Sequence, residues 1–187
     1  VYEAMDPIVF KDILKEQAKG IAGILPILQT LKTDEVLSPK VRVFQRESLA
    51  EVFNDSLNCK SGLVYEIVSA KEFQKVIGEK FHYSRRRVKK GVQLKSLRVR
   101  SKEIKKYSAS KHKRELREAR FLPRDLDFDG SISFWDDTVV FFSTKAEGVH
   151  VMITSKSLRE MMEQIFNLLW SVSGVMDTGT DHKKTVK

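Results

Sequence analysis

Hydrophobic and polar positions alternate most clearly near the end of the chain, in the stretch SISFWDDTVVFFSTKAEGVHVMITSKSLREMMEQIFNLLW (131–170). Three runs rich in β-branched and aromatic residues lie at 131–135, 138–144 and 148–153. The turn-forming pairs Asp136-Asp137 and Glu147-Gly148 separate them, and this arrangement predicts a meander of three strands. Apolar residues then recur at steps of three and four, which predicts an amphipathic helix that packs on the sheet. Its apolar stripe consists of Leu158, Met161, Met162, Ile165, Leu169 and Trp170.

Short apolar runs also alternate with amphipathic stretches between residues 40 and 122. The pattern predicts strands at Val41–Gln45, Leu63–Ser69, Val92–Val99 and Ala119–Leu122, and helices at 47–57 and 71–89. Strands that alternate with helices are typical of βαβ units, so we expect a largely parallel sheet. The polar segment 101–116 is expected to be an exposed helix or a loop.

The first 32 residues have the pattern of one long helix. Asp6 is a suitable N-cap, and Pro7 suits the first helical position. Apolar residues then repeat in heptads, and the predicted seam is Phe10, Leu14, Gln17, Ile21, Ile24, Leu28 and Leu31. Gly20, Gly23 and Pro26 weaken or kink the second half. We expect a linker helix that forms a homodimer; the alternative is that it folds back on its own domain.

These patterns divide the chain into three parts. Residues 1–33 are the expected linker and dimerisation helix, 40–173 one α/β domain, and 174–187 a tail without periodicity that is expected to be disordered. The chain starts at Val1 without an initiator methionine, so we expect it to be part of a longer protein.

Composition places the chain among water-soluble globular proteins. It has 187 residues, a formal net charge of +9 and a single cysteine, Cys59, so no internal disulfide is possible. No apolar run approaches the roughly 20 residues that cross a bilayer, and no signal-peptide pattern opens the chain. We therefore expect no membrane association and a cytoplasmic location, where free thiols are common.

The positive charge is concentrated in one segment, residues 80–120. This segment contains 17 Lys and Arg against three acids, Glu103, Glu115 and Glu118. Such density attracts polyanions through counterion release. The candidate nucleic-acid contacts are Arg85, Arg86, Arg87, Lys89 and Lys90. The alternative is a solvated helix face whose apolar stripe packs inward while its cations face water.

Motifs for catalysis or metal binding are not found in the sequence. The four histidines lack metal-ligand spacing, and no phosphate-binding loop, nucleophile elbow or HExxH string occurs. Asp136-Asp137 fits a turn between two strands better than a magnesium site. We therefore predict no catalytic residue, no metal and no cofactor.

Several segments resemble the effector part of TrmB-like transcriptional regulators. "YEAMDPIVFKDILKEQ" and "ILPILQTL" resemble the family's linker helix, and "VRVFQRESLAEVFNDSL" its first strand and helix; "RELREARFLP" and "MITSKSLREMMEQIFNLLW" resemble later segments. The resemblance runs from about Tyr2 to Ser171. It implies an α/β fold with a phospholipase D-like mixed sheet flanked by helices, after a long N-terminal linker helix.

Active phospholipase D-like enzymes use a His-x-Lys-x-x-x-x-Asp motif. If its final Asp is aligned on Asp136, Asp129 stands at the His position and Ser131 at the Lys position; alignment on Asp137 gives Gly130 and Ile132. Neither frame supplies a nucleophile or a cation, so we expect no phosphodiester chemistry.

The resemblance implies a non-catalytic effector domain that dimerises and modulates DNA binding by a separate winged-helix domain, which is not part of this chain. A stand-alone nucleic-acid-binding protein that uses residues 80–120 is the alternative. A ligand of such a sheet is expected at the carboxyl ends of its parallel strands. The candidates there are Ser69, Lys71, Arg98, Arg100 and Ser131, and the arginines favour a small anionic ligand.

Overall fold

A computed structural model describes residues 7–35, 38–78, 82–104 and 109–176 of the chain. The chain divides into two units, Val1–Pro39 and Lys40–Lys187. The first contains one helix, α1 (Pro7–Glu35), with Pro26 inside it. The predicted helix is therefore present.

Residues 40–176 alternate between strands and helices. The strands are β1 (Lys40–Gln45), β2 (Leu63–Val68), β3 (Gln93–Arg98), β4 (Arg117–Phe121), β5 (Ser131–Trp135), β6 (Thr138–Phe142), β7 (Val149–Thr154) and β8 (Gly174–Val175). The helices are η1 (Arg46–Ser48), α2 (Leu49–Leu57), α3 (Ala70–Ile77), α4 (Tyr83–Lys89), η3 (Arg100–Lys102), α5 (Ala109–Arg114) and α6 (Lys156–Val172).

In the described part of the chain, eight strands form one sheet in the order β1-β7-β6-β5-β2-β3-β4-β8. Only β2 with β3 and β3 with β4 pair in parallel; the other five pairings are antiparallel. The expectation of a largely parallel sheet is thus wrong. The β5–β7 meander lies between β1 and β2, which places β1 at the far edge, antiparallel to β7.

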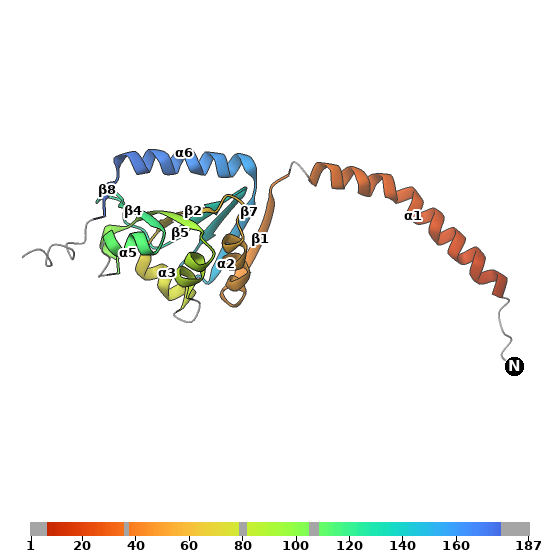
Figure 1. Ribbon diagram of the computed structural model, residues 1–187. Helices are drawn as coiled ribbons and strands as arrows, with labels where there is room; N and C mark the ends of the chain where they lie inside the picture. The colour runs from red at the N-terminus through yellow and green to blue at the C-terminus, as the bar shows by residue number, and fades with distance from the viewer. Residues whose placement is uncertain (1–6, 36–37, 79–81, 105–108, 177–187) are drawn as a thin grey trace, which may run out of the picture. The chain divides into compact units, whose positions relative to one another are not determined.

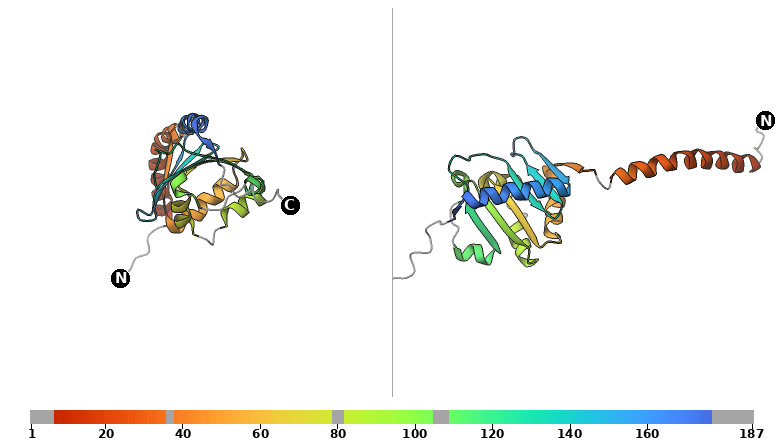
Figure 2. Two further views of the ribbon diagram at one scale, coloured as in Figure 1. Left: turned by 90° about the vertical axis from the view of Figure 1, so that its left-hand side faces the viewer. Right: turned by 90° about the horizontal axis from the view of Figure 1, so that it is seen from above.

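Helices cover the two faces of this sheet unequally (Figures 1 and 2). Helices α2, α3 and α5 lie on one face, which we call the helix side, and α6 runs along the other, which we call the α6 side. The helix-side core includes Val64, Leu94 and Phe142. The α6-side core includes Tyr65 and Ile67, which stack or pack with residues of β5 and α6 such as Phe134 and Phe166. Because successive side chains of β2 point to opposite faces of the sheet, β2 contributes residues to both cores.

The predicted single helix over 71–89 is also wrong. It divides into α3, which ends at Ile77, and α4, which begins at Tyr83. Gly78 adopts a left-handed conformation (φ +75°) and its N–H donates to the carbonyl of Gln74, which ends α3. His82, just before α4, is left-handed too (φ +50°). The apolar stripe continues across this break, which is why periodicity alone did not show it.

The tail was expected to be disordered from residue 174, but its first residues are ordered. Gly174 and Val175 form β8, which pairs with the edge of β4, and the side chain of Met176 is buried. The remainder of that expected tail, 177–187, lies outside the described residues. Among the described helices, none has the length and apolarity needed to cross a membrane.

Candidate functional site

The sheet register brings the predicted ligand-binding positions to one edge. Val68, the last residue of β2, pairs with Arg98 of β3 on one side and with Ser131 of β5 on the other. Ser69 follows Val68 directly, and Lys71 lies in the first turn of α3. The backbone positions predicted from sequence are therefore neighbours in space.

Their side chains, however, do not converge on one point. Ser69 and Ser131 are buried, and the hydroxyl of each lacks a hydrogen-bond partner among the described residues. Lys71 and Arg100 are exposed, and the Arg100 guanidinium lies over the ring of Phe121, 4.3 Å from its centroid. Of the five candidates, Arg98 alone lines the cavity described below.

Arg98 is a buried cation held by two buried carboxylates. Its guanidinium bonds to both carboxylate oxygens of Glu103, one of them from Nη2 at 3.0 Å, and lies 3.5 Å from Glu66 Oε1. The hydroxyl of Ser96 donates to the same Glu66 oxygen at 2.6 Å. A buried charge requires such partners, because its transfer out of water is expensive. We call Glu66, Arg98 and Glu103 the buried ion triad.

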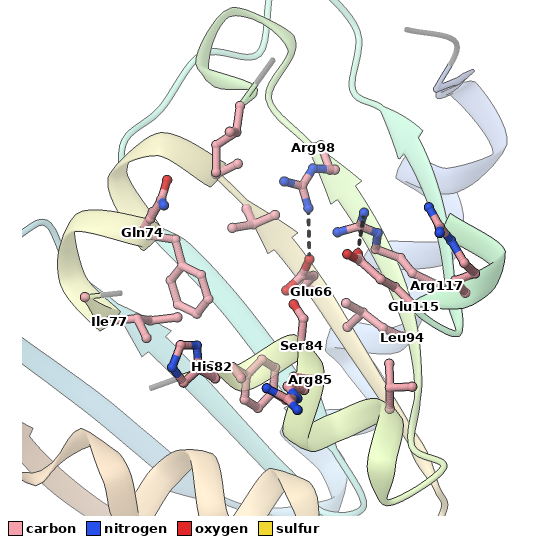
Figure 3. A pocket seen from close by; sticks show the side chains of 18 residues that line it. Glu66, Gln74, Ile77, His82, Ser84, Arg85, Leu94, Arg98, Glu115 and Arg117 are labelled. Carbon is pink, nitrogen blue, oxygen red and sulfur yellow. Dashed lines mark hydrogen bonds and ion pairs between the residues drawn. The ribbon is translucent and has the colours of Figure 1, made fainter. Parts of the chain in front are cut away.

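A cavity of about 580 Å³ lies next to this triad on the helix side of the sheet (Figure 3). Strands β2 and β3 supply Glu66, Leu94 and Arg98, and helices α3, α4 and α5 supply the opposite walls. Its apolar lining consists of Val68, Ala70, Phe73, Ile77, Tyr83, Val88, Leu94 and Ile104. We call it the helix-side cavity.

Charge in the helix-side cavity is positive on balance. Glu66 is ion-paired with Arg98, and Glu115 with Arg117 at 2.9 Å, as the dashed lines of Figure 3 mark. Arg85 and Arg114 also line the cavity, are exposed, and have no ion-pair partner among the described residues. Two guanidinium groups beside an apolar wall favour an anion that carries an apolar part.

Tyr83 adds a neutral polar group to the same cavity. Burial raises the pKa of its hydroxyl to about 12, so the hydroxyl stays protonated at neutral pH. It shares a hydrogen bond of 3.0 Å with the hydroxyl of Ser56 on α2. Tyr83 thus ties α4 to α2 and contributes no negative charge to repel an anion.

The candidate nucleic-acid contacts divide into exposed and buried residues. Arg85, Arg86, Lys89 and Lys90 are exposed at α4, where Arg86 Nη2 donates to Asn54 Oδ1 at 2.6 Å and Lys90 donates to Asn58. Arg87 is fully buried, and its guanidinium donates to the backbone carbonyls of Val92, Glu115 and Leu116. The prediction that Arg87 contacts nucleic acid is therefore corrected: it joins α4 to the strands below it.

Other cations of the basic segment also have structural partners. Arg117 donates from Nε to Nδ1 of His112 at 3.0 Å, and Lys102 pairs with Asp127 and Asp129. Lys95 and Arg120 both lie over the ring of Trp170. Much of the charge that the sequence concentrates in 80–120 is therefore used within the fold.

Two carboxylates of the candidate site were missed from the sequence. Glu66 interrupts an otherwise apolar strand, LVYEIV, and such a residue signals a buried partner of opposite charge. Glu103 had no comparable signal, because its contact with Arg98 depends on the turn η3.

The turn interpretation of Asp136 agrees with the structure. Asp136 has a left-handed backbone (φ +45°) in the turn between β5 and β6, and its carboxylate accepts from the N–H groups of Lys60 and Ser61. Burial opposes ionisation, but these N–H groups outweigh it and lower the pKa of Asp136. In the described residues, no group of His, Cys, Asp and Glu is placed to hold a metal ion.

The heptad seam of α1 is exposed along its described side chains. Phe10, Leu14, Ile21 and Ile24 are each more than half exposed, and Gln17 is exposed as well. The side chain of Leu28 lies outside the described residues. Among the described residues of its unit, the seam therefore presents an exposed apolar stripe.

Comparison with solved structures finds several that are similar to this fold. The structure of TrmBL2, an archaeal chromatin protein with a novel mode of DNA binding, matches with a TM-score of 0.51 and 16% identity, covering 89% of this chain and 67% of that chain. Nuc from Salmonella typhimurium, a phospholipase D family member, matches with a TM-score of 0.49 and 15% identity over 74% of this chain and 99% of that chain. NucT from Helicobacter pylori matches with a TM-score of 0.48 and 11% identity over 74% of this chain and all of that chain.

No family model and no curated protein matches the chain. At these identities the structural likeness concerns the fold alone. The predicted fold class, an α/β domain with a mixed sheet flanked by helices after a long N-terminal helix, is confirmed.

Proposed function

We propose that this chain is the effector and dimerisation part of a TrmB-like transcriptional regulator, which modulates DNA binding by a separate winged-helix domain. The observation that carries the proposal is α1, a helix of 29 residues whose heptad seam is exposed from Phe10 to Ile24. A helix of this kind buries its stripe against a second copy in a coiled coil. The fold likeness to TrmBL2 supports the proposal, because it extends over 89% of this chain.

Pairing through α1 is tested by two charges placed in the seam. Leu14→Glu with Ile21→Glu is expected to convert a dimer into a monomer, because both positions face the partner helix. The matched control is Lys15→Glu with Ala22→Glu, which has the same spacing of seven but lies outside the seam. Light scattering after size exclusion measures the mass. A seam variant that remains a dimer would contradict pairing through α1.

The proposed ligand is a small anion with an apolar part, bound in the helix-side cavity. Arg85 and Arg114 bind its charged group, and the wall around Phe73 and Ile77 contacts the remainder. For such a ligand to regulate DNA binding, it must bind two arrangements of the dimer with different affinity. The predicted positions Ser69, Lys71, Arg100 and Ser131 stay candidates at the neighbouring sheet edge.

Phenyl phosphate, an aromatic anion, is a suitable probe of this site. Saturable NMR shifts at α3 and α4 are expected, and Arg85→Gln with Arg114→Gln should weaken binding at least tenfold through the loss of two charge-assisted bonds. Lys113→Gln is the matched control, since Lys113 is exposed on α5 but does not line the cavity. Equal weakening in the control would point to bulk charge rather than to this cavity.

The effector domain is proposed to be non-catalytic. With Asp136 aligned on the final Asp of the phospholipase D-like motif, Asp129 stands at the His position and Ser131 of β5 at the Lys position, and neither supplies the nucleophile or the cation of that chemistry. We expect no turnover of bis-p-nitrophenyl phosphate by the wild-type chain or by Ser131→Ala. Hydrolysis that depends on Ser131 would overturn this part of the proposal.

A second candidate function is direct nucleic-acid binding through α4. It is favoured by the four exposed cations Arg85, Arg86, Lys89 and Lys90 on consecutive turns. Four phosphate contacts correspond to a log–log salt slope of about −3.6. Arg85→Gln with Lys89→Gln should halve that slope, whereas Lys156→Gln on α6 should leave it unchanged. A chain that binds DNA only weakly at low salt favours the effector proposal instead.

A further inference from the structure

A second cavity, of about 610 Å³, lies on the opposite side of the sheet from the helix-side cavity. We call it the α6-side cavity. Its floor includes Ile67 of β2, Ile132 of β5 and Val151 of β7, and α6 forms one wall. Figures 1 and 2 show α6 lying along this face of the sheet. The two cavities are separated by the sheet itself, because the neighbours Glu66 and Ile67 line one each.

The lining of the α6-side cavity is almost entirely hydrocarbon. No charged side chain contributes to it among the described residues, and its apolar members include three from α6, Met162, Ile165 and Leu169. The rings of Phe128 and Phe141 also line it, and its polar contributions come from Ser131 and Ser143. Water in such a space finds few hydrogen-bond partners, so an apolar guest displaces it favourably.

The depth of the cavity distinguishes a small molecule from a protein partner. Ile67, Leu122 and Met162 line it and are buried members of the α6-side core. Phe141 and Ile165 line its rim and are exposed. A protein surface laid on this face would cover the exposed rim, whereas a small molecule can also contact the buried residues below it. The volume also falls within the range of small-molecule sites.

We propose that the α6-side cavity binds an uncharged, hydrocarbon-rich small molecule. The guest lies between the sheet and α6, with its apolar body against Ile67 and Met162. A charged group is excluded from the interior, because no counter-charge lines the cavity and a buried unpaired charge is expensive. This site is independent of the proposed anionic ligand, which binds on the other side of the sheet.

Nile red, a neutral dye whose emission shifts to the blue in apolar surroundings, is the probe for this site. A saturable titration with one dye per chain is expected. Ile165→Lys places a charge at the rim and should weaken binding at least tenfold. Leu168→Lys is the matched control: Leu168 is 68% exposed on the same helix but does not line the cavity, so binding should stay within twofold.

A second pair of variants keeps the test valid if Ile165→Lys fails to fold. Val149→Lys lies on β7 at the rim, and Val41→Lys is its control on β1, where Val41 is exposed and does not line the cavity. Thermal unfolding shows which variants are folded. The expected result is loss of dye binding in the rim variants only.

Two results would overturn the proposal. Non-saturable binding, or equal loss in Leu168→Lys and Val41→Lys, means that the dye coats exposed apolar side chains. A fall in molecular mass in Leu168→Lys, together with increased dye binding, means that a second copy of the chain covers this face instead.

Discussion

Replacement of Arg98 by methionine is expected to destabilise the domain strongly. Met keeps much of the side-chain volume but removes the guanidinium, which leaves Glu66 and Glu103 without their cation. The three side chains are 6%, 4% and 9% exposed for Glu66, Arg98 and Glu103, so solvent cannot replace the lost partner without rearrangement. Loss of one member of a buried ion pair costs about 3–5 kcal/mol. Two carboxylates are affected here, which favours the upper part of that range.

This loss is large relative to the whole stability of the domain. Domains of this size unfold with about 5–15 kcal/mol, and each kcal/mol shifts the melting temperature by about 2–4 °C. Arg98→Met should therefore lower the melting temperature by about 6–20 °C. Urea denaturation followed by circular dichroism gives the free energy of unfolding, provided that wild type and variant share the same dependence on urea.

Two further proteins show whether the loss comes from the ion triad. Arg100→Met, two residues away, removes an exposed cation that lies over Phe121, and should cost about 1 kcal/mol at most. In Arg98→Met with Glu103→Gln, part of the stability should return, because one unpaired carboxylate has been removed. A loss in Arg98→Met no larger than in Arg100→Met would refute the reasoning. Arg98 would then be a solvated cation, free to bind a ligand.

Three further predictions concern contacts outside the triad. Arg120→Met should lower the free energy of unfolding, measured by urea denaturation, by about 1 kcal/mol. The reason is that Arg120 lies 4.7 Å from the Trp170 ring centroid and donates to the Trp170 carbonyl. Burial, aided by nearby cations, lowers the pKa of His112 from 6.5 to about 4. As the pH falls, the unfolded chain therefore takes up this proton first, so the free energy of unfolding should decrease from pH 6.5 to pH 4. His112→Gln should flatten this part of the plot of unfolding free energy against pH. An unchanged slope in His112→Gln would contradict the prediction. Asp136→Ala should lower the free energy of unfolding by about 1–3 kcal/mol, because Ala loses both hydrogen bonds and strains a left-handed backbone. Asp136→Gly loses the same hydrogen bonds but relieves the strain, so urea denaturation should show a smaller loss for this variant.

The C-terminal half of the fold was predictable because its signals are local. Alternating residues and the turn pair Asp136-Asp137 define β5 and β6 within a few residues, and the stripe of α6 is continuous. The strand order was not predictable, since β1 pairs with β7 more than 100 residues later and no local pattern records that choice. The end of α3 had a local signal, Gly78, which matters more than the apolar stripe that continues beyond it.

The backbone positions of the candidate site were predictable from the sequence, but the directions and partners of its side chains were not. Carboxyl ends of adjacent parallel strands must meet at one edge, so Ser69 and Arg98 were correctly expected to be neighbours in space. The direction and partners of each side chain depend on residues far along the chain: Glu66 is 32 residues from Arg98. A single sequence shows the charges of such a network without showing which of them pair.

This difference between charge that is present and charge that is available decides how the basic segment should be tested. If all 17 cations of residues 80–120 contacted phosphate, the log–log salt slope of DNA binding would be about −15. The fold uses Arg87, Arg98 and Arg117 internally, and places others on Trp170 or beside Asp127 and Asp129. With the four exposed cations of α4 alone, the slope is about −3.6. A measured slope far steeper than that would require the internal ion pairs to open on binding. The Arg98→Met variant, which lacks one of these cations, would then show a changed salt slope. A slope near −3.6 or shallower is the result that the folded arrangement predicts.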